Sequence, residues 1–312
     1  MVELTKQSNS AGQVGIASKI AYNLRLFAMR LNGGNEGAAL ADGVLDEIAG
    51  IVSEFEARTG RKAAESTVVE IGYGARPARL FALSGFFGRV VGMDLDSPVL
   101  QLSDIAAVFR RNGFERGLKS LVRHALFDAR SWKRFHARLR AAAPRYDPDA
   151  VTILVGDAGG DAVWRDVPPA DLVFSSDVFE HIPPEALPAM LRSLAQRLAP
   201  GGIVITRPMV FTGIAGGHDL EWYPHRVDSN ASGSAWGHLL DPAFQTNTYL
   251  NKLCRADFAA LFREHGFRIV RDHAMLGRLG ERHLTAQRRS ELAGFDDYEL
   301  FSNRVEFVLE KA

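Results

Sequence analysis

The chain has 312 residues and a mass of 34.2 kDa, which fits either two domains of ordinary size or one elaborated α/β domain. Its 37 basic side chains balance 37 acidic ones, and this balance excludes a protein drawn to nucleic acid by net charge alone. A hydrophobic content of 46% and a mean hydropathy of −0.07 exclude disordered and fibrous chains.

The cysteine content and the N-terminus bear on where the protein works. The one cysteine, Cys254, forms no internal disulfide and builds no thiolate metal site. The first fifteen residues lack the apolar core of a secretion signal, and no stretch approaches the ~20 apolar residues that a membrane span needs. We therefore expect a cytoplasmic protein without a membrane span.

Two helices are expected near the N-terminus. Apolar residues recur every three or four positions over 16–31 and again over 36–57, which is the spacing of amphipathic helices. The first helix packs on its own protein or, in the alternative, lies on a membrane surface. We expect residues 1–65 to form a helical cap ahead of a second domain over 66–312.

The pattern changes at Thr67, where short β-branched runs begin to alternate with helical stretches. This alternation predicts a parallel sheet with helices on both faces. A helix opened by Pro183-Pro184 and stopped at Pro200, and another over 256–265, lie among the strands. The strands are expected at 67–71, 89–93, 151–155, 170–174, 202–206, 267–270 and 304–309.

Two segments exceed a minimal α/β unit. Residues 101–145 carry eleven Lys and Arg against three acids. This composition predicts a basic helical insert, whose charges form a solvated face or, in the alternative, a surface for phosphates or nucleic acid. Residues 210–251 have no long periodic run, and we expect a lid or substrate loop there. Aromatic residues and histidines would line it: Trp222, Tyr223, His225, Trp236 and His238.

The strand at 67–71 runs into a turn with glycines at 72 and 74, ahead of a helix opened at Pro77. Such glycines let a ligand lie against the backbone at a helix N-terminus. Asp94, twenty-two residues after Gly72, closes the second strand, where a carboxylate can accept hydrogen bonds from a ribose diol. Because Pro77 replaces the third glycine of the dinucleotide fingerprint, a nucleotide without a diphosphate fits better.

Six motifs follow one another along residues 67–310. They are Glu70-Ile71-Gly72-Tyr73-Gly74, Val91-Gly92-Met93-Asp94, Gly156-Asp157-Ala158, the run from Asp171 to Ile182, Leu198-Ala199-Pro200-Gly201-Gly202 and the run from Phe262 to Phe267. In order and spacing the chain resembles the class I S-adenosylmethionine-dependent methyltransferases, in particular their small-molecule branch. The resemblance implies an α/β fold with a Rossmann-like, doubly wound, seven-stranded sheet, whose antiparallel last strand lies beside the sixth.

The resemblance also implies a binding site for S-adenosylmethionine (SAM) at the strand ends. Glu70, Gly72 and Gly74 would hold the methionine moiety, and Asp94 the ribose hydroxyls. Carboxylates suit a cofactor with a sulfonium and an ammonium, although such acids also serve as ordinary capping or turn residues. The family usually has a third glycine where this chain has Arg76, whose side chain pairs with the cofactor carboxylate, pairs with an anionic substrate or points to solvent.

The later motifs extend the implied cofactor site. Asp157 would meet the adenine amino group with Ala158 beside the ring, and Ser176 and Asp177 would lie near the sulfonium. S-adenosylhomocysteine (SAH) is the product that the resemblance implies. The complete set of cofactor-binding residues expected here is Glu70, Gly72, Tyr73, Gly74, Asp94, Leu95, Asp157, Ala158 and Ser176.

Methyl transfer from a sulfonium is an in-line displacement, so catalysis depends on holding the acceptor near ~3 Å from the methyl group. A hydroxyl acceptor must also lose its proton, and histidine is the usual base. The candidates are His181 just past the fourth strand, with Asp177 beside it, and the loop histidines His218, His225 and His238.

A metal-assisted mechanism is the alternative to a histidine base. Asp177-x-x-Glu180-His181, with a later histidine such as His238, resembles the metal-assisted subset of these methyltransferases, in which a divalent ion polarises the acceptor hydroxyl. In the interpretation that we favour, Glu180 and His181 only buttress the following helix, and the metal stays undecided.

The leading functional hypothesis is methyl transfer from SAM to a small or medium-sized, hydroxylated acceptor. Two alternatives are an RNA or polyanion methyltransferase that uses the basic insert, and a cofactor-binding regulatory subunit without turnover. A nicotinamide dehydrogenase is disfavoured by Pro77 and by the motif at Asp157. We expect a small-molecule acceptor as partner rather than nucleic acid, and the oligomeric state is not readable from the sequence.

Overall fold

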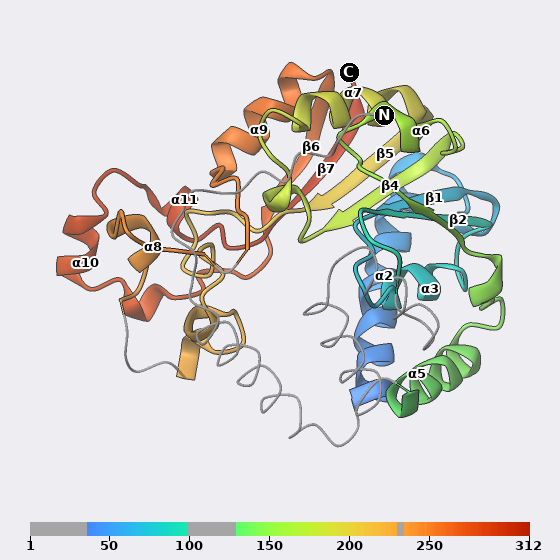
Figure 1. The fold of residues 1–312 in the computed structure, drawn as a ribbon, viewed down its shortest axis with the longest axis horizontal. Helices are drawn as coiled ribbons and strands as arrows, with labels where there is room; N and C mark the ends of the chain where they lie inside the picture. The colour runs from blue at the N-terminus through green and yellow to red at the C-terminus, as the bar shows by residue number, and fades with distance from the viewer. Residues whose placement is uncertain (1–35, 99–128, 230–233, 247) are drawn as a thin grey trace.

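The computed structural model describes residues 36–98, 129–229, 234–246 and 248–312, and a seven-stranded sheet forms the centre of these residues (Figure 1). The strand order is β3-β2-β1-β4-β5-β7-β6. Neighbours among β1–β5 pair in parallel, and β7 runs antiparallel to β5 and β6, which confirms the predicted sheet. The strands are β1 Thr67–Ile71, β2 Arg89–Asp94, β3 Thr152–Val155, β4 Ala170–Ser176, β5 Leu198–Arg207, β6 Phe267–Ala274 and β7 Val305–Lys311.

The two central strands are mostly buried because helices cover both of their faces. In β1, Val68, Val69 and Ile71 are no more than 1% exposed, and β4 is buried without a break from Leu172 to Ser176. β1 pairs with β2 on one side and with β4 on the other. The carboxyl ends of these three strands therefore lie side by side at one edge of the sheet.

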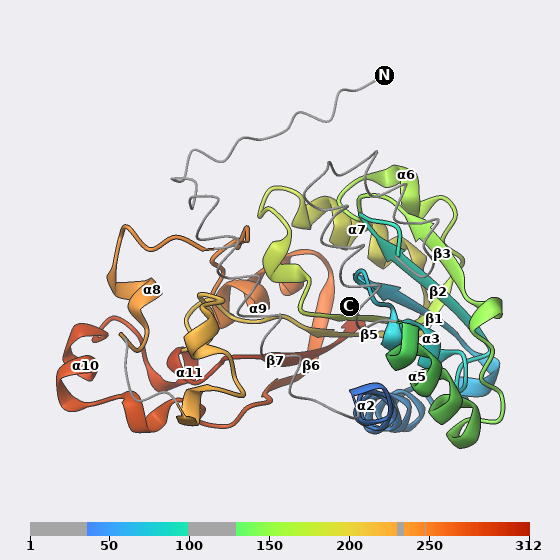
Figure 2. The ribbon, with the colours of Figure 1, turned by 60° about the horizontal axis from the view of Figure 1, so that its bottom comes forward.

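Helices form a layer on each face of the sheet, as Figures 1 and 2 show from two directions. Phe55 of α2 packs with Leu80 of α3 in the core of one layer, and Leu191 of α7 lies with Phe258 of α9 in the core of the other. The first layer holds α2 Glu36–Thr59, α3 Ala78–Leu83 and α5 Ala129–Ala142, and the second holds α6 Asp161–Trp164, α7 Leu187–Arg197 and α9 Arg255–Glu264.

The N-terminal helix α2 agrees with the helix predicted over 36–57, whereas the helix predicted over 16–31 lies outside the described residues. Ile48, Ile51 and Phe55, three or four residues apart, are fully buried in the core that α2 shares with the sheet. This spacing is the reason for the helix: it places the apolar side chains on one stripe.

Part of the predicted basic insert is described, namely α5, while residues 99–128 lie outside the description. Phe135 and Leu139 of α5 are fully buried in the core shared with α2. On the outer side, Nε of Arg138 donates to Oδ1 of Asp42 at 2.7 Å. In α5, therefore, the aromatic Phe135 belongs to the core and Arg138 ties the helix to α2.

Several element boundaries differ from the predicted ones; β6, for example, continues to Ala274 instead of ending at 270. The helix expected from Pro183 begins at Leu187, because a residue before proline is biased toward extended backbone and residues 183–186 form a turn. The strand β5 starts at Leu198, directly after α7, and its pairing with β4 shifts between Ala170 and Leu172. A proline without an amide and Gly201 at φ 73° account for this irregular start.

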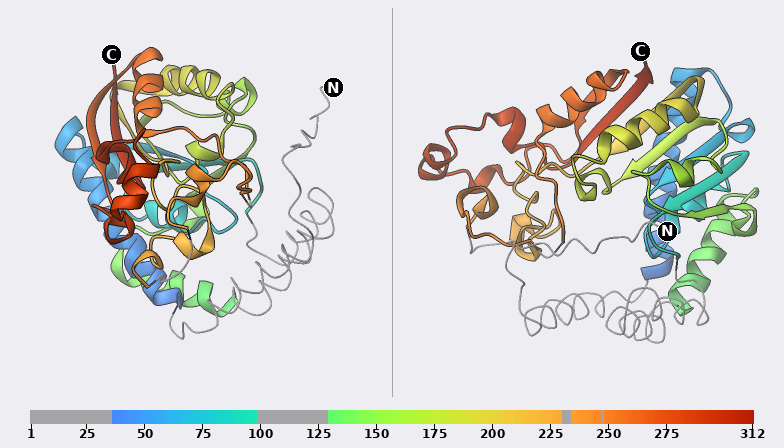
Figure 3. Two further views of the ribbon diagram at one scale, coloured as in Figure 1. Left: turned by 90° about the vertical axis from the view of Figure 1, so that its left-hand side faces the viewer. Right: turned by 45° about the horizontal axis from the view of Figure 1, so that its top comes forward.

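The segment predicted as a lid is part of a small lobe with its own hydrophobic core. This accessory lobe consists of the described residues of 208–251 and 275–303, and it extends from the sheet at the left of Figure 1 and in the right panel of Figure 3. Trp222 and Trp236 are buried in its core together with Leu292, Leu300 and Phe301. The two tryptophans, expected to line a substrate loop, hold the lobe together instead.

Short helices complete the description. Within the described residues, no helix is both long and apolar enough to cross a membrane. The lobe contains η5 Leu220–Trp222, η6 Val227–Ser229, α8 Gly237–Leu240, η7 Glu281–His283, α10 Ala286–Glu291 and α11 Asp297–Leu300, and the sheet connections contain η1 Ala63–Glu65, η3 Pro148–Ala150 and η4 Phe179–His181.

Candidate active site

A cavity of about 250 Å³ lies where β1, β2, β3 and β4 end. It brings together eight of the residues predicted from the sequence, which belong to four separate motifs. Its lining is Ile71, Gly72, Gly74, Met93, Asp94, Leu95, Gly156, Asp157, Ala158, Asp177, Val178, His181 and Ile182. Six predicted residues are not part of this lining: Glu70, Tyr73, Ser176, His218, His225 and His238.

The glycine turn after β1 forms one wall of the cavity. Gly72 has φ 79° and Gly74 φ 68°, a left-handed backbone that glycine adopts without steric cost. A Cβ on Gly72 would lie 2.1 Å from Cγ2 of Val178, whereas a Cβ on Gly74 would meet no atom within 4 Å. Close approach requires glycine at 72, and backbone conformation favours it at both positions.

Asp94 is fixed at the end of β2 by backbone amides. The amide of Gly74 donates to its Oδ2 at 2.7 Å, and the amide of Asp96 donates to its Oδ1 at 3.1 Å. Each carboxylate oxygen has a second lone pair, so the side chain can still accept from a ligand. Asp94 thus connects the glycine turn of β1 with the end of β2.

Asp157 and Ala158 follow β3 in a tight turn. Oδ1 of Asp157 accepts from the amide of Gly159 at 2.8 Å, and the carbonyl of Ala158 accepts from Nε1 of Trp164 at 2.8 Å. Across the cavity mouth, Leu95 is 67% exposed. The cavity therefore combines carboxylates with an uncovered apolar side chain.

Glu70 contacts a neighbouring arginine instead of the cavity. Its side chain is 1% exposed, and Oε1 accepts from Nε of Arg79 at 2.7 Å, while Oε2 is buried without a hydrogen-bond partner among the described residues. Burial raises the pKa of Glu70, and the charge of Arg79 opposes this rise. The acid of the first motif thus sits behind the glycine turn, on the side of α3.

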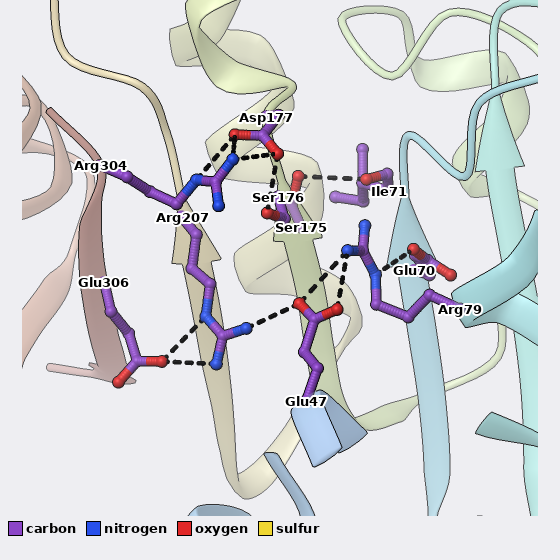
Figure 4. A network of polar contacts seen from close by, with 10 residues as sticks. All are labelled: Glu47, Glu70, Ile71, Arg79, Ser175, Ser176, Asp177, Arg207, Arg304 and Glu306. Carbon is purple, nitrogen blue, oxygen red and sulfur yellow. Dashed lines mark hydrogen bonds and ion pairs between the residues drawn. The ribbon is translucent and has the colours of Figure 1, made fainter. Parts of the chain in front are cut away.

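The pair of Glu70 and Arg79 continues into a chain of ion pairs that reaches three further elements, α2, β5 and β7 (Figure 4). Glu47 of α2 accepts from Nη1 of Arg79 at 3.3 Å and from Nη1 of Arg207, at the end of β5, at 2.8 Å. Arg207 in turn donates to Oε2 of Glu306 in β7 at 2.7 and 2.9 Å. The sequence offered no signal for this chain of ion pairs, because its directly bonded members lie up to 160 positions apart.

Tyr73 and Ser176 have structural contacts near the cavity. The hydroxyl of Tyr73 donates to the carbonyl of Asp96 at 3.1 Å, and burial raises the pKa of that hydroxyl. Ser176 Oγ donates to Oδ2 of Asp177 at 3.4 Å. Both side chains therefore support neighbours of the cavity, and neither contributes to its lining.

Asp177 lines the cavity from the end of β4 and is held by an arginine that the sequence analysis did not identify. Nε of Arg304 donates to Oδ1 at 3.0 Å and Nη2 donates to Oδ2 at 2.9 Å (Figure 4). Such a two-pronged pair fixes the carboxylate in orientation as well as in position. Asp177 itself has φ 58°, a left-handed conformation that is uncommon for residues other than glycine.

His181 lies next to Asp177 in η4 and lines the same cavity. Its Nδ1 lies 2.9 Å from the carbonyl oxygen of Tyr249, so this nitrogen is the donor and the other ring nitrogen carries a lone pair. The ring of His218, from the accessory lobe, packs edge-on against it at a centroid distance of 5.2 Å. Of the predicted bases, His181 is thus the one in the cavity.

Two groups with unusual surroundings lie beside His181. Burial, with the charge of Asp177 as a second cause, raises the pKa of Glu180 to about 8. Burial, with the charges of His181 and His238 as further causes, lowers the pKa of His218 to about 4. Both side chains are therefore neutral near pH 7 in the protein as described.

The other two loop histidines lie elsewhere in the lobe. His225 is exposed and lies against Tyr223 at a ring-centroid distance of 6.0 Å. His238 is buried, with Nε2 2.7 Å from the carbonyl oxygen of Phe211. Burial lowers the pKa of His238 to about 4.

Arg76, the departure from the family pattern, is half-buried in the turn before Pro77 and is not among the residues that line the cavity. Pro77 precedes α3 as its N-cap, as the sequence predicted. The alternatives for Arg76 as a partner of the cofactor or of the acceptor thus stay open.

The chain matches a family model described as a methyltransferase domain over residues 44–272, well over half of its length. Among solved structures it is similar to DesVI of Streptomyces venezuelae, with 19% identity, coverage of 96% of this chain and 100% of that one, and a TM-score of 0.44.

Two further similar structures are the magnesium protoporphyrin IX methyltransferase of Synechocystis with bound SAH (15% identity, coverage 96% and 90%, TM-score 0.42) and an S-adenosylmethionine-dependent methyltransferase of Clostridium acetobutylicum (8% identity, coverage 96% and 100%, TM-score 0.45). The curated proteins contain no match.

Proposed function

Because the chain belongs to the methyltransferase domain family, it is a SAM-dependent methyltransferase, and we propose that it methylates a hydroxyl oxygen of a small or medium-sized acceptor. One observation carries the proposal. The carboxylates of Asp94, Asp157 and Asp177 and the ring of His181 share one cavity at the strand ends. The acids suit a cationic cofactor, and the histidine suits a hydroxyl that must lose a proton.

The cavity residues fit SAM in their chemistry. We assign the ribose hydroxyls to Asp94, whose oxygens keep free lone pairs, and the adenine amino group to Asp157. The exposed side chain of Leu95 and the methyl of Ala158 offer apolar surface to the flat base. SAM, when bound, supplies an electrophilic methyl group on a sulfonium.

We assign the methionine moiety to the glycine turn, where Gly72 and Gly74 leave the backbone uncovered. Glu70 would act on this moiety through the turn and through Arg79, because its own carboxylate is buried behind them. Tyr73 and Ser176 are positioning residues in this assignment, since they bond the neighbours of the cavity.

The acceptor would lie at the end of the cavity formed by Asp177 and His181. The lone pair on the second ring nitrogen of His181 is available to the acceptor hydroxyl, because Nδ1 donates to the Tyr249 carbonyl. Asp177, oriented by Arg304, presents negative charge on the side where the sulfonium would lie. The accessory lobe, which contributes Tyr249, would select the acceptor.

A turnover assay tests the proposal. The purified chain is incubated with SAM and a panel of small hydroxylated compounds, and SAH formation is measured. We expect turnover with a subset of the panel, and His181→Ala should lower turnover at least about 100-fold while changing SAM affinity less than about threefold.

The assay also separates the alternatives. Tight SAM binding by calorimetry without SAH formation on any acceptor would indicate a regulatory cofactor-binding subunit. Salt-sensitive affinity for RNA together with RNA methylation would indicate a polyanion methyltransferase. Unchanged turnover of His181→Ala would remove this residue from the mechanism.

A further inference from the structure

Three side chains from two parts of the fold converge beside the cavity. Glu180 and His181 belong to η4, directly after β4, and His218 comes from the accessory lobe. One ligand atom of each, a carboxylate oxygen or an imidazole nitrogen, lies within 4.8 Å of the ligand atoms of the other two. Carboxylate and imidazole are the common protein ligands of divalent transition metals.

The polar atoms of this cluster lack the partners that buried polar atoms normally have. Both carboxylate oxygens of Glu180 and Nε2 of His218 are buried without a hydrogen bond of good geometry among the described residues, and only the backbone amides of Glu180 and Met209 lie near the Glu180 carboxylate. The Glu180 residue is 3% exposed. Buried polar groups left without a partner lose their hydration and gain no hydrogen bond in return, so they are rare in native proteins. Three unsatisfied atoms in one small cluster indicate a missing ligand.

The surroundings hold the cluster in the manner of a metal site. Nδ1 of His181 donates to the Tyr249 carbonyl at 2.9 Å, an outer hydrogen bond of the kind that orients a metal-binding imidazole and leaves its other nitrogen without a proton. Asn251 Nδ2 donates to the carbonyls of Phe179 and Ile182 at 2.7 and 3.0 Å. The backbone amide of Asn251 donates to the carbonyl of Glu180 at 2.8 Å, so Asn251 holds η4 and the residue after it by three hydrogen bonds.

We propose that Glu180, His181 and His218 bind one divalent transition-metal ion at the edge of the cavity. Two imidazoles and one carboxylate favour ions such as Zn²⁺, Fe²⁺ or Mn²⁺ over Mg²⁺ and Ca²⁺, which prefer all-oxygen sites. Three protein ligands leave at least one coordination position open. Because His181 is itself part of the lining, an ion held by these residues would lie beside the cavity.

The geometry selects this set of ligands over the one suggested by the motif. Asp177 is engaged by both prongs of Arg304, and His238 is not among the described residues whose ligand atoms converge beside the cavity. His218 takes the place expected for His238, held at φ 53° by the turn of the lobe. The third ligand of the site is therefore supplied by the accessory lobe, through its packing against the sheet.

The role of the ion rests on the proposed function. An acceptor hydroxyl bound at the open position would have its pKa lowered by the ion and would lose its proton to water. The resulting alkoxide attacks the methyl carbon: the O–CH₃ bond forms, the S–CH₃ bond breaks, and the sulfonium becomes a thioether. In this arrangement His181 holds the ion instead of taking the proton.

Metal binding itself is measured without SAM or acceptor. The untagged full chain is stripped with EDTA, dialysed against buffered Zn²⁺ or Mg²⁺, and its bound metal is counted by mass spectrometry; Co²⁺ is then titrated while its visible absorption is recorded. We expect one Zn²⁺ per chain, no retained Mg²⁺, and a Co²⁺ spectrum with nitrogen ligation.

Variants assign the site. Glu180→Gln and His218→Ala should each weaken Zn²⁺ binding at least about 100-fold, since loss of even an outer partner costs 10–100-fold. His273→Ala, an exposed histidine of β6, is the matched control and should bind as wild type. Circular dichroism confirms folding, and His218→Gln, closer in size, replaces His218→Ala if the latter unfolds.

Two results would overturn the proposal: less than a tenth of an equivalent of Zn²⁺ at saturation, or Zn²⁺ and Co²⁺ binding that both Glu180→Gln and His218→Ala leave unchanged. Failure of the metal site is distinct from failure of the methyltransferase function. SAH formation by EDTA-stripped protein at the same rate as by the Zn²⁺-loaded protein would leave the function intact and remove the ion from the reaction.

Discussion

At the scale of single residues, the cavity depends on side chains that serve the fold and the ligand at once. Asp94 accepts hydrogen bonds from the amides of Gly74 and Asp96, so the same carboxylate that orders the turn faces the cavity. Its position follows from the strand end, and its orientation follows from the two amides. A substitution there affects both.

Asp94→Asn tests the ribose assignment. The amide keeps the shape of the side chain but removes the charge and half of the acceptor capacity, so we expect SAM affinity to fall at least about tenfold. Isothermal titration calorimetry measures it, and Asp96→Asn, an exposed neighbour, is the control. Wild-type affinity in Asp94→Asn would contradict the assignment.

The pair Gly72→Ala and Gly74→Ala separates steric crowding from backbone strain. Both glycines have positive φ, but only the new Cβ at 72 would collide, with Val178. We expect the free energy of unfolding to fall by about 2–4 kcal/mol for Gly72→Ala and by about 1–2 kcal/mol for Gly74→Ala. Urea denaturation gives both values, and equal losses would contradict the crowding at 72.

At the scale of elements, the helix α2 is joined to the sheet by charge as well as by its apolar stripe. Glu47 accepts from arginines of α3 and β5, and Glu54 pairs with Arg271 of β6 at 2.8 Å. The Arg79 and Arg207 guanidinium groups also lie 4.8 and 5.2 Å from the Phe174 ring centre. Through Arg79, the N-terminal helix is thus connected to the turn that borders the cavity.

Glu47→Gln should lower the free energy of unfolding by about 1–3 kcal/mol, because Arg79 and Arg207 each lose a charged acceptor. The loss should lie in the lower part of this range if Arg79 stays paired with Glu70 and Arg207 stays paired with Glu306, because each arginine then keeps one charged acceptor. Urea unfolding of Glu47→Gln beside Asp46→Asn, an exposed neighbour on α2, measures the difference. Equal stability of the two variants would show that the ion pairs of Glu47 contribute nothing.

At the scale of the whole molecule, the accessory lobe and the sheet meet at the site. Arg304 and His218 come from the lobe side, and Asp177 and His181 come from the end of β4. The tryptophans among the described residues of 210–251 are buried in one core with Leu292, Leu300 and Phe301 of the long connection between β6 and β7. Neither segment would bury this core without the other.

The dependence of the unfolding free energy on pH should reveal the lowered pKa of Glu306, the β7 carboxylate that pairs with Arg207 and Arg271. Burial alone would raise the pKa of Glu306, but Arg207 and Arg271 outweigh burial and hold the pKa below its ordinary value of 4.5. A carboxyl with a lower pKa in the folded chain stabilises that chain above its unfolded pKa, and this stabilisation is lost as the pH falls through the folded pKa.

We therefore expect the wild type to lose more unfolding free energy than Glu306→Gln between about pH 6 and pH 3. Urea melts at intervals across this range measure both slopes. Glu264→Gln, an exposed carboxylate at the end of α9, should follow the wild type. Parallel curves for wild type and Glu306→Gln would contradict the shift in pKa.

The sequence by itself determined the sheet, the glycine turn and the acids at the strand ends. These features depend on neighbours in the chain: a β-branched run predicts a strand, and a residue that closes the strand lies at its end wherever the strand packs. Asp94, Asp157 and Asp177 came together in one cavity for this reason.

Only the tertiary structure decided which side chains contact the residues at the strand ends. Arg304 pairs with Asp177 across 127 positions, Glu70 turns to Arg79, and His218 rather than His238 meets His181. Side-chain partners of this kind depend on how the lobe and α2 pack on the sheet, since contacts between distant segments leave no local pattern in the sequence.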